Sequence, residues 1–314
     1  MKPDRFEGQA IAARFGASIS HLVWFVAGLQ LVFILAALTV WRVTGQADSA
    51  AGLFRLQGSV FLTAFALVEY LLSLICWRLF DRGDLLRTAW LLIAIASGSR
   101  VAGLVVANFV IRFKPAGVLS GVSGASAAQA AAIRELGLTI SSPLTAALLG
   151  AGLFVVLRLY RKVGLLRRPT WGDAIPLVIV GLFLASQTWA GVRRLMAVKG
   201  ADPLLTGTGW IVAPLVGLLL LEAILLHRAV RSMEGGLIGS CWGAYVSAIL
   251  LTAIGDIGVW AMSSGYAQPQ YSYLNTLVWF MASIAYALGP AHQIEAVMRA
   301  RGVSLSAGQS GGRA

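Results

Sequence analysis

Long apolar runs of about 20 residues recur along the chain, and they constrain its fold more than any other feature. A helix rises about 1.5 Å per residue, so a helix of that length crosses the ~30 Å hydrocarbon core of a bilayer. The 314 residues are 58% hydrophobic and only 12% charged, whereas about a quarter of the residues in soluble domains are charged. We therefore expect an all-α, polytopic helix bundle that spans a membrane and has the lipid bilayer as its surroundings.

The apolar runs predict about eight transmembrane helices. These spans cover residues 17–41, 58–77, 90–111, 142–160, 174–190, 207–226, 237–261 and 274–291. Tryptophans stand at or near many of their ends, as in the aromatic belts of membrane proteins. The spans are expected to form a single bundle over 17–301, after a polar arm at 1–16 and before a disordered Gly/Ser-rich tail at 302–314. The first run is too long for a signal peptide and is interpreted as an uncleaved anchor helix.

One loop, residues 112–138, is longer than the others. Ser126 and Gln129 within it have the spacing of a capping box, and Gly137 is typical of a helix end. The pattern predicts a short, separate helix over 127–136 inside the loop.

Basic residues are distributed unevenly between the two sides of these spans. The net charge is +12, and sixteen Lys and Arg residues fall in the loops and ends on one side against eight on the other. An excess of Lys and Arg marks the cytoplasmic side of a membrane protein. We therefore expect both termini in the cytoplasm, and the threading explains the basic charge without nucleic acid as a partner.

Two opposite charges lie deep inside consecutive spans. Glu69 and Arg100 are at matching depth in the spans 58–77 and 90–111. Because a charge in mid-membrane is costly, the sequence predicts that the two form an ion pair. Two interpretations stay open: a structural pair that fixes helix packing, or the centre of a substrate or proton site. Asn108 belongs to the same candidate polar centre.

Two further carboxylates lie within the spans. Asp256 is near the end of the span 237–261, and Thr252 precedes it by one helical turn on the same face. The pair could form the polar floor of a pocket open to the outside, or Asp256 could simply reach the membrane interface. We expect Glu222, near the cytoplasmic end of its span, to reach the interface or to pair with Arg228.

Metal and cofactor chemistry has little support in the residue pattern. The three histidines, His21, His227 and His292, occur singly and outside any HxxxH or HExxH pattern. Haem or metal binding would require two or more ligands that face each other, so we expect no cofactor, with a haem or metal site at these histidines as the alternative. The two cysteines are interpreted as small buried hydrophobic residues.

The hairpin of the last two spans resembles the membrane-sensor region of bacterial multi-span signalling proteins that precede diguanylate cyclase or histidine kinase modules. The residues that carry the resemblance are Asp256, Gly265, Tyr266, Pro269, Leu274, Leu277, Trp279 and Tyr286, and RTAWLLIAIA at 87–96 resembles an earlier helix of that class. In those proteins the last helix continues into an output domain, whereas here a short tail follows Arg301. The resemblance implies a sensor unit without an attached enzyme.

We thus expect a multi-pass protein of a bacterial inner membrane that acts as a standalone sensory or scaffold unit, with a protein partner at its cytoplasmic loops and without enzymatic activity. The alternative is a small transporter or membrane enzyme that uses the Glu69–Arg100 centre.

Overall fold

The structure, a computed structural model, is entirely helical in the regions that it describes. It describes residues 19–32, 34–36, 39, 43, 47–106, 127–165, 175, 178, 181–182, 203–231, 236–263 and 272–310. An N-terminal helix, Ile19–Ala36, comes first. It is followed by α2 (Ala47–Leu79), α3 (Leu85–Val105), α4 (Ala127–Lys162), α6 (Pro203–Arg231), α7 (Leu237–Ser263) and α8 (Ser272–Ser310). The all-α class expected from the sequence is confirmed for this part of the chain.

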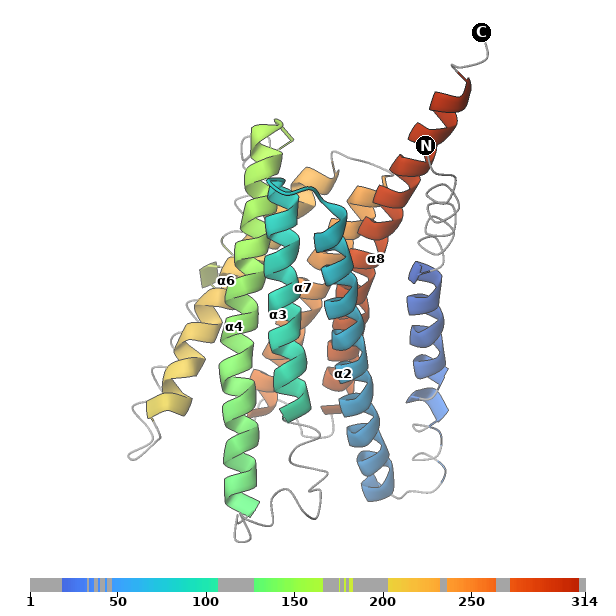
Figure 1. Cartoon of the computed structure of the whole chain (residues 1–314). Helices are drawn as coiled ribbons and strands as arrows, with labels where there is room; N and C mark the ends of the chain where they lie inside the picture. The colour runs from blue at the N-terminus through green and yellow to red at the C-terminus, as the bar shows by residue number, and fades with distance from the viewer. Residues whose placement is uncertain are drawn as a thin grey trace, which may run out of the picture.

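Six of these helices form a closed ring. Going round it, α2 packs on α3, α3 on α4, α4 on α6, α6 on α7, α7 on α8, and α8 returns to α2. The helices lie side by side along one direction, and α3 and α7 run opposite to α2, α4, α6 and α8 (Figure 1). The first and last helices of the ring are therefore neighbours, although they are distant in sequence.

The N-terminal helix packs on the outside of the ring against α2 and α8. Its Val23 and Ala27 share a buried cluster with Phe65 of α2 and Phe280 of α8, whose rings make an edge contact at 5.5 Å. The opposite face of this helix exposes Leu22, Trp24, Phe25, Leu29, Leu31, Val32 and Leu35. That wide apolar face needs a lipid or protein cover, because soluble proteins rarely expose apolar patches of this size.

Within the part of the chain that the structure describes, five helical segments are long and apolar enough to cross a membrane. They are Ile19–Ala36, Val60–Leu79, Leu85–Val105, Ile140–Lys162 and Leu237–Gly258. Many large apolar side chains on the outer faces of the ring are exposed as well. Both observations agree with a membrane-embedded helical fold.

Aromatic rings fill the interior of the ring. Trp90 of α3 stacks on Trp242 of α7 at 5.6 Å, and Tyr245 lies 6.1 Å from Trp90 and 5.9 Å from Tyr286 of α8. All four side chains are buried. Aromatic pairs at these separations contribute beyond the area that they bury, so this stack joins three helices of the ring.

Two local signals end or begin helices at the same end of the ring. Asp84 caps α3 by accepting a hydrogen bond from the Leu86 N–H at 2.8 Å, after a turn in which Gly83 has φ of 100°. At the end of α4, Gly164 has φ of 76°, and the Leu165 N–H donates to the Tyr160 carbonyl at 3.0 Å. This is the Schellman arrangement, in which a glycine in the left-handed conformation closes a helix.

Two expectations about chain segments are corrected. The separate helix over 127–136 does not exist, because α4 runs without a break from Ala127 through Gly137 and Pro143 to Lys162. Similarly, the helix expected to stop near Arg301 continues to Ser310, so most of the segment expected to be a disordered tail is helical.

Candidate functional site: a buried ion pair inside the ring

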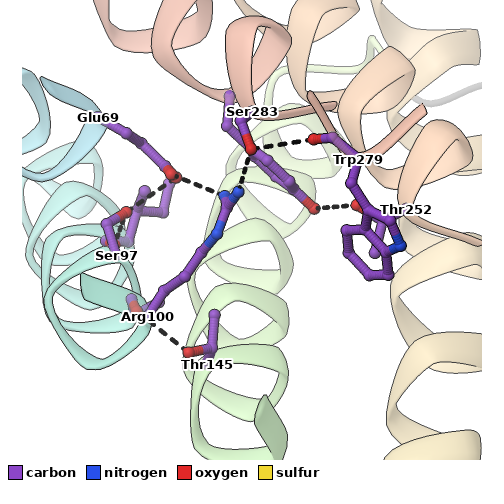
Figure 2. Close-up of polar contacts among 10 residues, drawn as sticks. Glu69, Ser97, Arg100, Thr145, Thr252, Trp279 and Ser283 are labelled. Carbon is purple, nitrogen blue, oxygen red and sulfur yellow. Dashed lines mark hydrogen bonds and ion pairs between the residues drawn. The ribbon is translucent and has the colours of Figure 1, made fainter. Parts of the chain in front are cut away.

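The two charges expected to pair are brought together inside the ring. Arg100 Nη1 of α3 donates to Glu69 Oε2 of α2 at 3.2 Å, as Figure 2 shows. The Glu69 side chain is 4% exposed and that of Arg100 is 18% exposed. Removing two charges from water is costly unless hydrogen bonds also satisfy their remaining polar atoms, so the neighbours of the pair determine what it can do.

Each partner of the ion pair has a serine of its own. The Ser97 hydroxyl lies 2.8 Å from Glu69 Oε1 and 2.9 Å from the Ile93 carbonyl oxygen. On the other side, Arg100 Nη2 donates to Ser283 Oγ of α8 at 2.5 Å, and Ser283 donates to the Trp279 carbonyl at 3.0 Å. The donation to Trp279 turns the Ser283 oxygen lone pairs toward Arg100, so α8 presents an acceptor to the guanidinium.

An aromatic ring completes the surroundings of the guanidinium. Arg100 Cζ lies 5.0 Å from the centroid of the Tyr286 ring on α8, which is a cation–π contact. The Tyr286 hydroxyl is in turn 3.5 Å from Thr252 Oγ1 of α7. Four helices, α2, α3, α7 and α8, thus meet at one polar centre (Figure 2).

Not every residue expected at this centre is part of it. Thr252 joins it through Tyr286. Asp256 lies one turn further along α7 on the same face and is half-buried. Asn108 falls outside the described residues. The structure therefore joins Glu69, Arg100 and Thr252, with Asp256 one helical turn beyond them.

The two charged side chains of the centre, Glu69 and Arg100, differ in exposure, and this difference determines which of them a ligand can reach. A guanidinium has five N–H donors, and two of those in Arg100 are used within the described part of the chain. Because its side chain keeps partial access to solvent while Glu69 is enclosed, the remaining donors of Arg100 are the most available charged groups of the centre. They suit an acceptor group such as a carboxylate, a carbonyl or water.

Sequence reasoning missed Ser97 and Ser283. Serine is common in this chain, and only the rotation of each helix decides which serine meets a charge. Tyr286 was singled out by the sensor-region resemblance, but its contact with Arg100 was not foreseen. The spacing of Ser283 and Tyr286, three residues apart on one helix face, is the signal that could have pointed to them.

The three histidines lie on three different helices. His21 of the N-terminal helix and His227 of α6 are exposed. His292 of α8 is half-buried, with Nδ1 3.8 Å from Glu295 Oε2. In the described regions, no three or more His, Cys, Asp or Glu side chains form a group that could hold a metal ion.

A second polar cluster on α8 joins it to the helices beside it. Glu295 is buried and accepts hydrogen bonds from Ser20 of the N-terminal helix, at 3.3 Å, and from Arg299. Two residues after Arg299, Arg301 Nη2 donates to the carbonyl of Leu79, the last residue of α2, at 2.7 Å. These contacts fasten α8 at the level where α2 ends.

No protein-family model matches the chain, and comparisons with curated proteins and with solved structures find no significant match.

Proposed function

We propose that the chain is an eight-span protein of a bacterial inner membrane with both termini in the cytoplasm. The position of its basic residues supports this threading. Apart from Arg100, every Lys and Arg whose side chain the structure describes lies near the same end of the ring. These residues are Arg78, Arg82, Arg87, Arg158, Arg161, Lys162, Arg228, Arg231, Arg299 and Arg301. Such an accumulation marks the cytoplasmic end.

Reporter fusions test this orientation directly. A reporter that works only in the cytoplasm should be active when fused at Ala314 and inactive when inserted in the loop 112–126. A reporter that works only in the periplasm should give the opposite result. The orientation is wrong if both reporters show the reverse pattern.

We further propose that the protein is a sensory unit in which α8 carries the state of the central ion pair to a cytoplasmic partner. One observation supports this function above others. The helix that provides Ser283 and Tyr286 to Arg100 continues past the ring to Ser310 and projects beyond the other helices (Figure 1). A ligand that binds Arg100 would compete with Ser283 for its N–H donors and would change the contact between α3 and α8.

The free energies of the Arg100 contacts are large enough to shift a conformational equilibrium of α8. A charge-assisted hydrogen bond contributes about 1.5–3 kcal/mol and a desolvated cation–π contact about 2 kcal/mol. A ligand shifts a conformational equilibrium only by its difference in affinity for the two states. Exchanging one contact of Arg100 for a ligand therefore gives a shift of about tenfold to a hundredfold between two positions of α8.

The distance between the α8 extension and the end of α2 measures this motion. Spin labels would be attached at Arg82→Cys, in the exposed turn after α2, and at Ser306→Cys, on the extension of α8. The native Cys76 and Cys241 are buried and free, which keeps them from competing for the label.

The comparison is between Ser283→Ala, which removes the hydrogen bond from Arg100 to α8, and a matched control. Thr145→Ala removes a hydrogen bond of 3.3 Å from α4 to the Ala96 carbonyl of α3, and it leaves α8 untouched. We expect Ser283→Ala to change the distribution of label distances and Thr145→Ala to leave it as in the wild type. If neither variant changes it, α8 does not carry the state of the centre and the sensory proposal fails.

A transporter or membrane enzyme at the same centre is the second candidate, and the partial exposure of Arg100 favours it. A substrate that reaches Arg100 in the wild type should raise the melting temperature in a concentration-dependent way. Uptake by reconstituted vesicles that is lost in Arg100→Gln would select the transporter over the sensor. A ligand that binds without uptake or turnover would select the sensor.

A further inference from the structure

Glu222 of α6 is buried without the partner that the sequence led us to expect. The residue is 4% exposed, and its Oε2 atom has no hydrogen-bond partner among the described residues. Arg228 lies six residues further along α6 and on a different face of the helix. The expectation that Glu222 reaches the interface or pairs with Arg228 is therefore wrong, because the side chain points into the packed seam between α6 and α4.

The seam is shaped to admit this side chain. A Cβ atom placed on Gly150 of α4 would lie 3.3 Å from Glu222 Oε2 and 3.6 Å from a methyl carbon of Leu219. That separation is tighter than ordinary contact, so a residue larger than glycine would press on the carboxyl group. The neighbours of the seam, Leu149 and Leu153 of α4 and Ala223 of α6, are buried and apolar.

Among the described residues of the helices that pack beside it, no charged group is placed to neutralise Glu222. The ionisable residues of α4 that precede Gly150 are Arg134 and Glu135, at least fifteen residues away, which corresponds to about 22 Å along the helix. Those that follow it begin at Arg158, eight residues beyond Gly150, which corresponds to about 12 Å. The ionisable residues of α7, the other neighbour of α6 in the ring, are Cys241, Tyr245 and Asp256, and those that follow Glu222 on α6 are His227, Arg228 and Arg231. None of these forms a hydrogen bond with Glu222 Oε2.

A carboxylate cannot remain ionised in such a place at low cost. An unpaired charge in an apolar interior loses its hydration and gains no partner, and a carboxyl group avoids this by taking up a proton. Glu69 differs, because it has a guanidinium at 3.2 Å and a serine hydroxyl at 2.8 Å. Glu69 and Glu222 therefore differ in their surroundings: Glu69 has a cationic partner in Arg100, and Glu222 has none among the described residues.

We propose that Glu222 is a proton-binding site in the seam between α4 and α6, separate from the Glu69–Arg100 centre, and that it is held there as a neutral carboxylic acid. The bound proton stabilises the packing of the two helices. Loss of that proton puts an unpaired charge against Gly150 and favours separation of the seam.

A hydrophobic carbodiimide distinguishes the two glutamates chemically. The reagent reacts with a protonated carboxyl group: the acid proton passes to a carbodiimide nitrogen and the carboxyl oxygen bonds to the central carbon, so the whole reagent is added. Mass spectrometry of the purified protein, treated at neutral pH in mild detergent with dicyclohexylcarbodiimide, locates the adduct. We expect at least about tenfold more adduct on Glu222 than on Glu69, because the reagent needs a protonated carboxyl group and Glu222 is held in that form. Equal labelling, or labelling of Glu69 alone, would overturn the proposal.

The dependence of the melting temperature on pH provides a second test, which does not require the carbodiimide to reach the carboxyl groups. At about pH 4 the Glu222 carboxyl is protonated in both the folded and the unfolded chain, and as the pH rises the unfolded chain gives up this proton first. The wild type should therefore melt at progressively lower temperature from about pH 4 to mildly alkaline pH, where the folded chain loses the proton as well. Glu222→Gln keeps the size and the neutral state of the side chain, so it should melt like the wild type near pH 4 and at a higher temperature than the wild type at neutral and alkaline pH. If Glu222→Gln clearly destabilises the protein at neutral pH, or follows the decline of the wild type over this range, the carboxyl is ionised and the proposal is wrong.

Discussion

The contribution of the central ion pair can be measured by removing its partners singly and together. Glu69→Leu leaves Arg100 charged, and a guanidinium does not lose its proton in proteins. Breaking a buried pair by removing one partner costs about 3–5 kcal/mol in soluble proteins. Arg100 keeps Ser283, the Tyr286 ring and 18% exposure of its side chain, so we expect roughly 2–4 kcal/mol for Glu69→Leu.

The reverse change should cost less. In Arg100→Leu the remaining partner, Glu69, keeps the Ser97 hydroxyl at 2.8 Å and can take up a proton. We expect about 1–3 kcal/mol, because a neutral buried acid with one hydrogen bond loses less than an unpaired charge. The double variant to leucine leaves no orphan charge and should recover much of the loss of either single variant.

The two native thiols provide the assay. Cys76 of α2 and Cys241 of α7 are fully buried, so a dye that fluoresces on reaction with thiols reports unfolding in detergent without added labels. At roughly 2 °C per kcal/mol for a chain of this size, Glu69→Leu should lower the melting temperature by about 4–8 °C. If both single variants melt like the wild type, or if the losses simply add in the double variant, the two residues do not interact and the α2–α3 register is wrong.

Three further outcomes are expected. Gly289→Ala should lower the melting temperature by several degrees, because its Cβ would overlap the Tyr245 ring. The control Gly243→Ala, which meets nothing within 4 Å, should melt at or above the wild-type temperature. Asp84→Ala removes the cap of α3 and should cost about 0.5–2 kcal/mol in the same assay, while Asp81→Ala in the preceding turn should cost less. The purified protein should show no haem absorption, and a Soret band that vanishes on replacing one of the histidines would contradict this expectation.

The helical class and the central ion pair could be predicted from the sequence, because the physical reasons for them do not depend on how the side chains pack. Apolar runs long enough to cross a bilayer determine the element type, and matching depth on consecutive helices brings Glu69 and Arg100 together. The surroundings of the pair were not predictable in the same way. Which face of α8 meets α3 is decided by side-chain packing over the whole ring, and without that rotation Ser283 cannot be distinguished from other serines.

Glu222 and α4 are two further cases in which packing between helices, and not the local sequence, decides the structure. The sequence predicts how far along α6 Glu222 lies, but not whether its side chain faces the neighbouring helices or the surroundings of the bundle. An interfacial carboxyl group and a buried one therefore could not be distinguished. In α4, Gly137 and Pro143 are common at helix ends, and either would normally separate two segments. Continuation of the helix through both depends on its packing against α3 and α6, which no local pattern records.

The positions of Glu69 and Arg100 along the chain affect how the helices of the ring insert and assemble during synthesis. Glu69 and Arg100 belong to consecutive helices joined by the short turn 80–84, so they can leave the ribosome and enter the bilayer together as a neutralised hairpin. Inserting a lone charge at the centre of a helix costs about 2.5–3.5 kcal/mol in the translocon, and the hairpin avoids bearing that cost twice. The serine and tyrosine that complete the site arrive later, with α8, which also closes the ring against α2. A nascent chain arrested before Ser272 would therefore hold the ion pair in an open bundle, in which the guanidinium lacks its contacts with Ser283 and Tyr286 of α8.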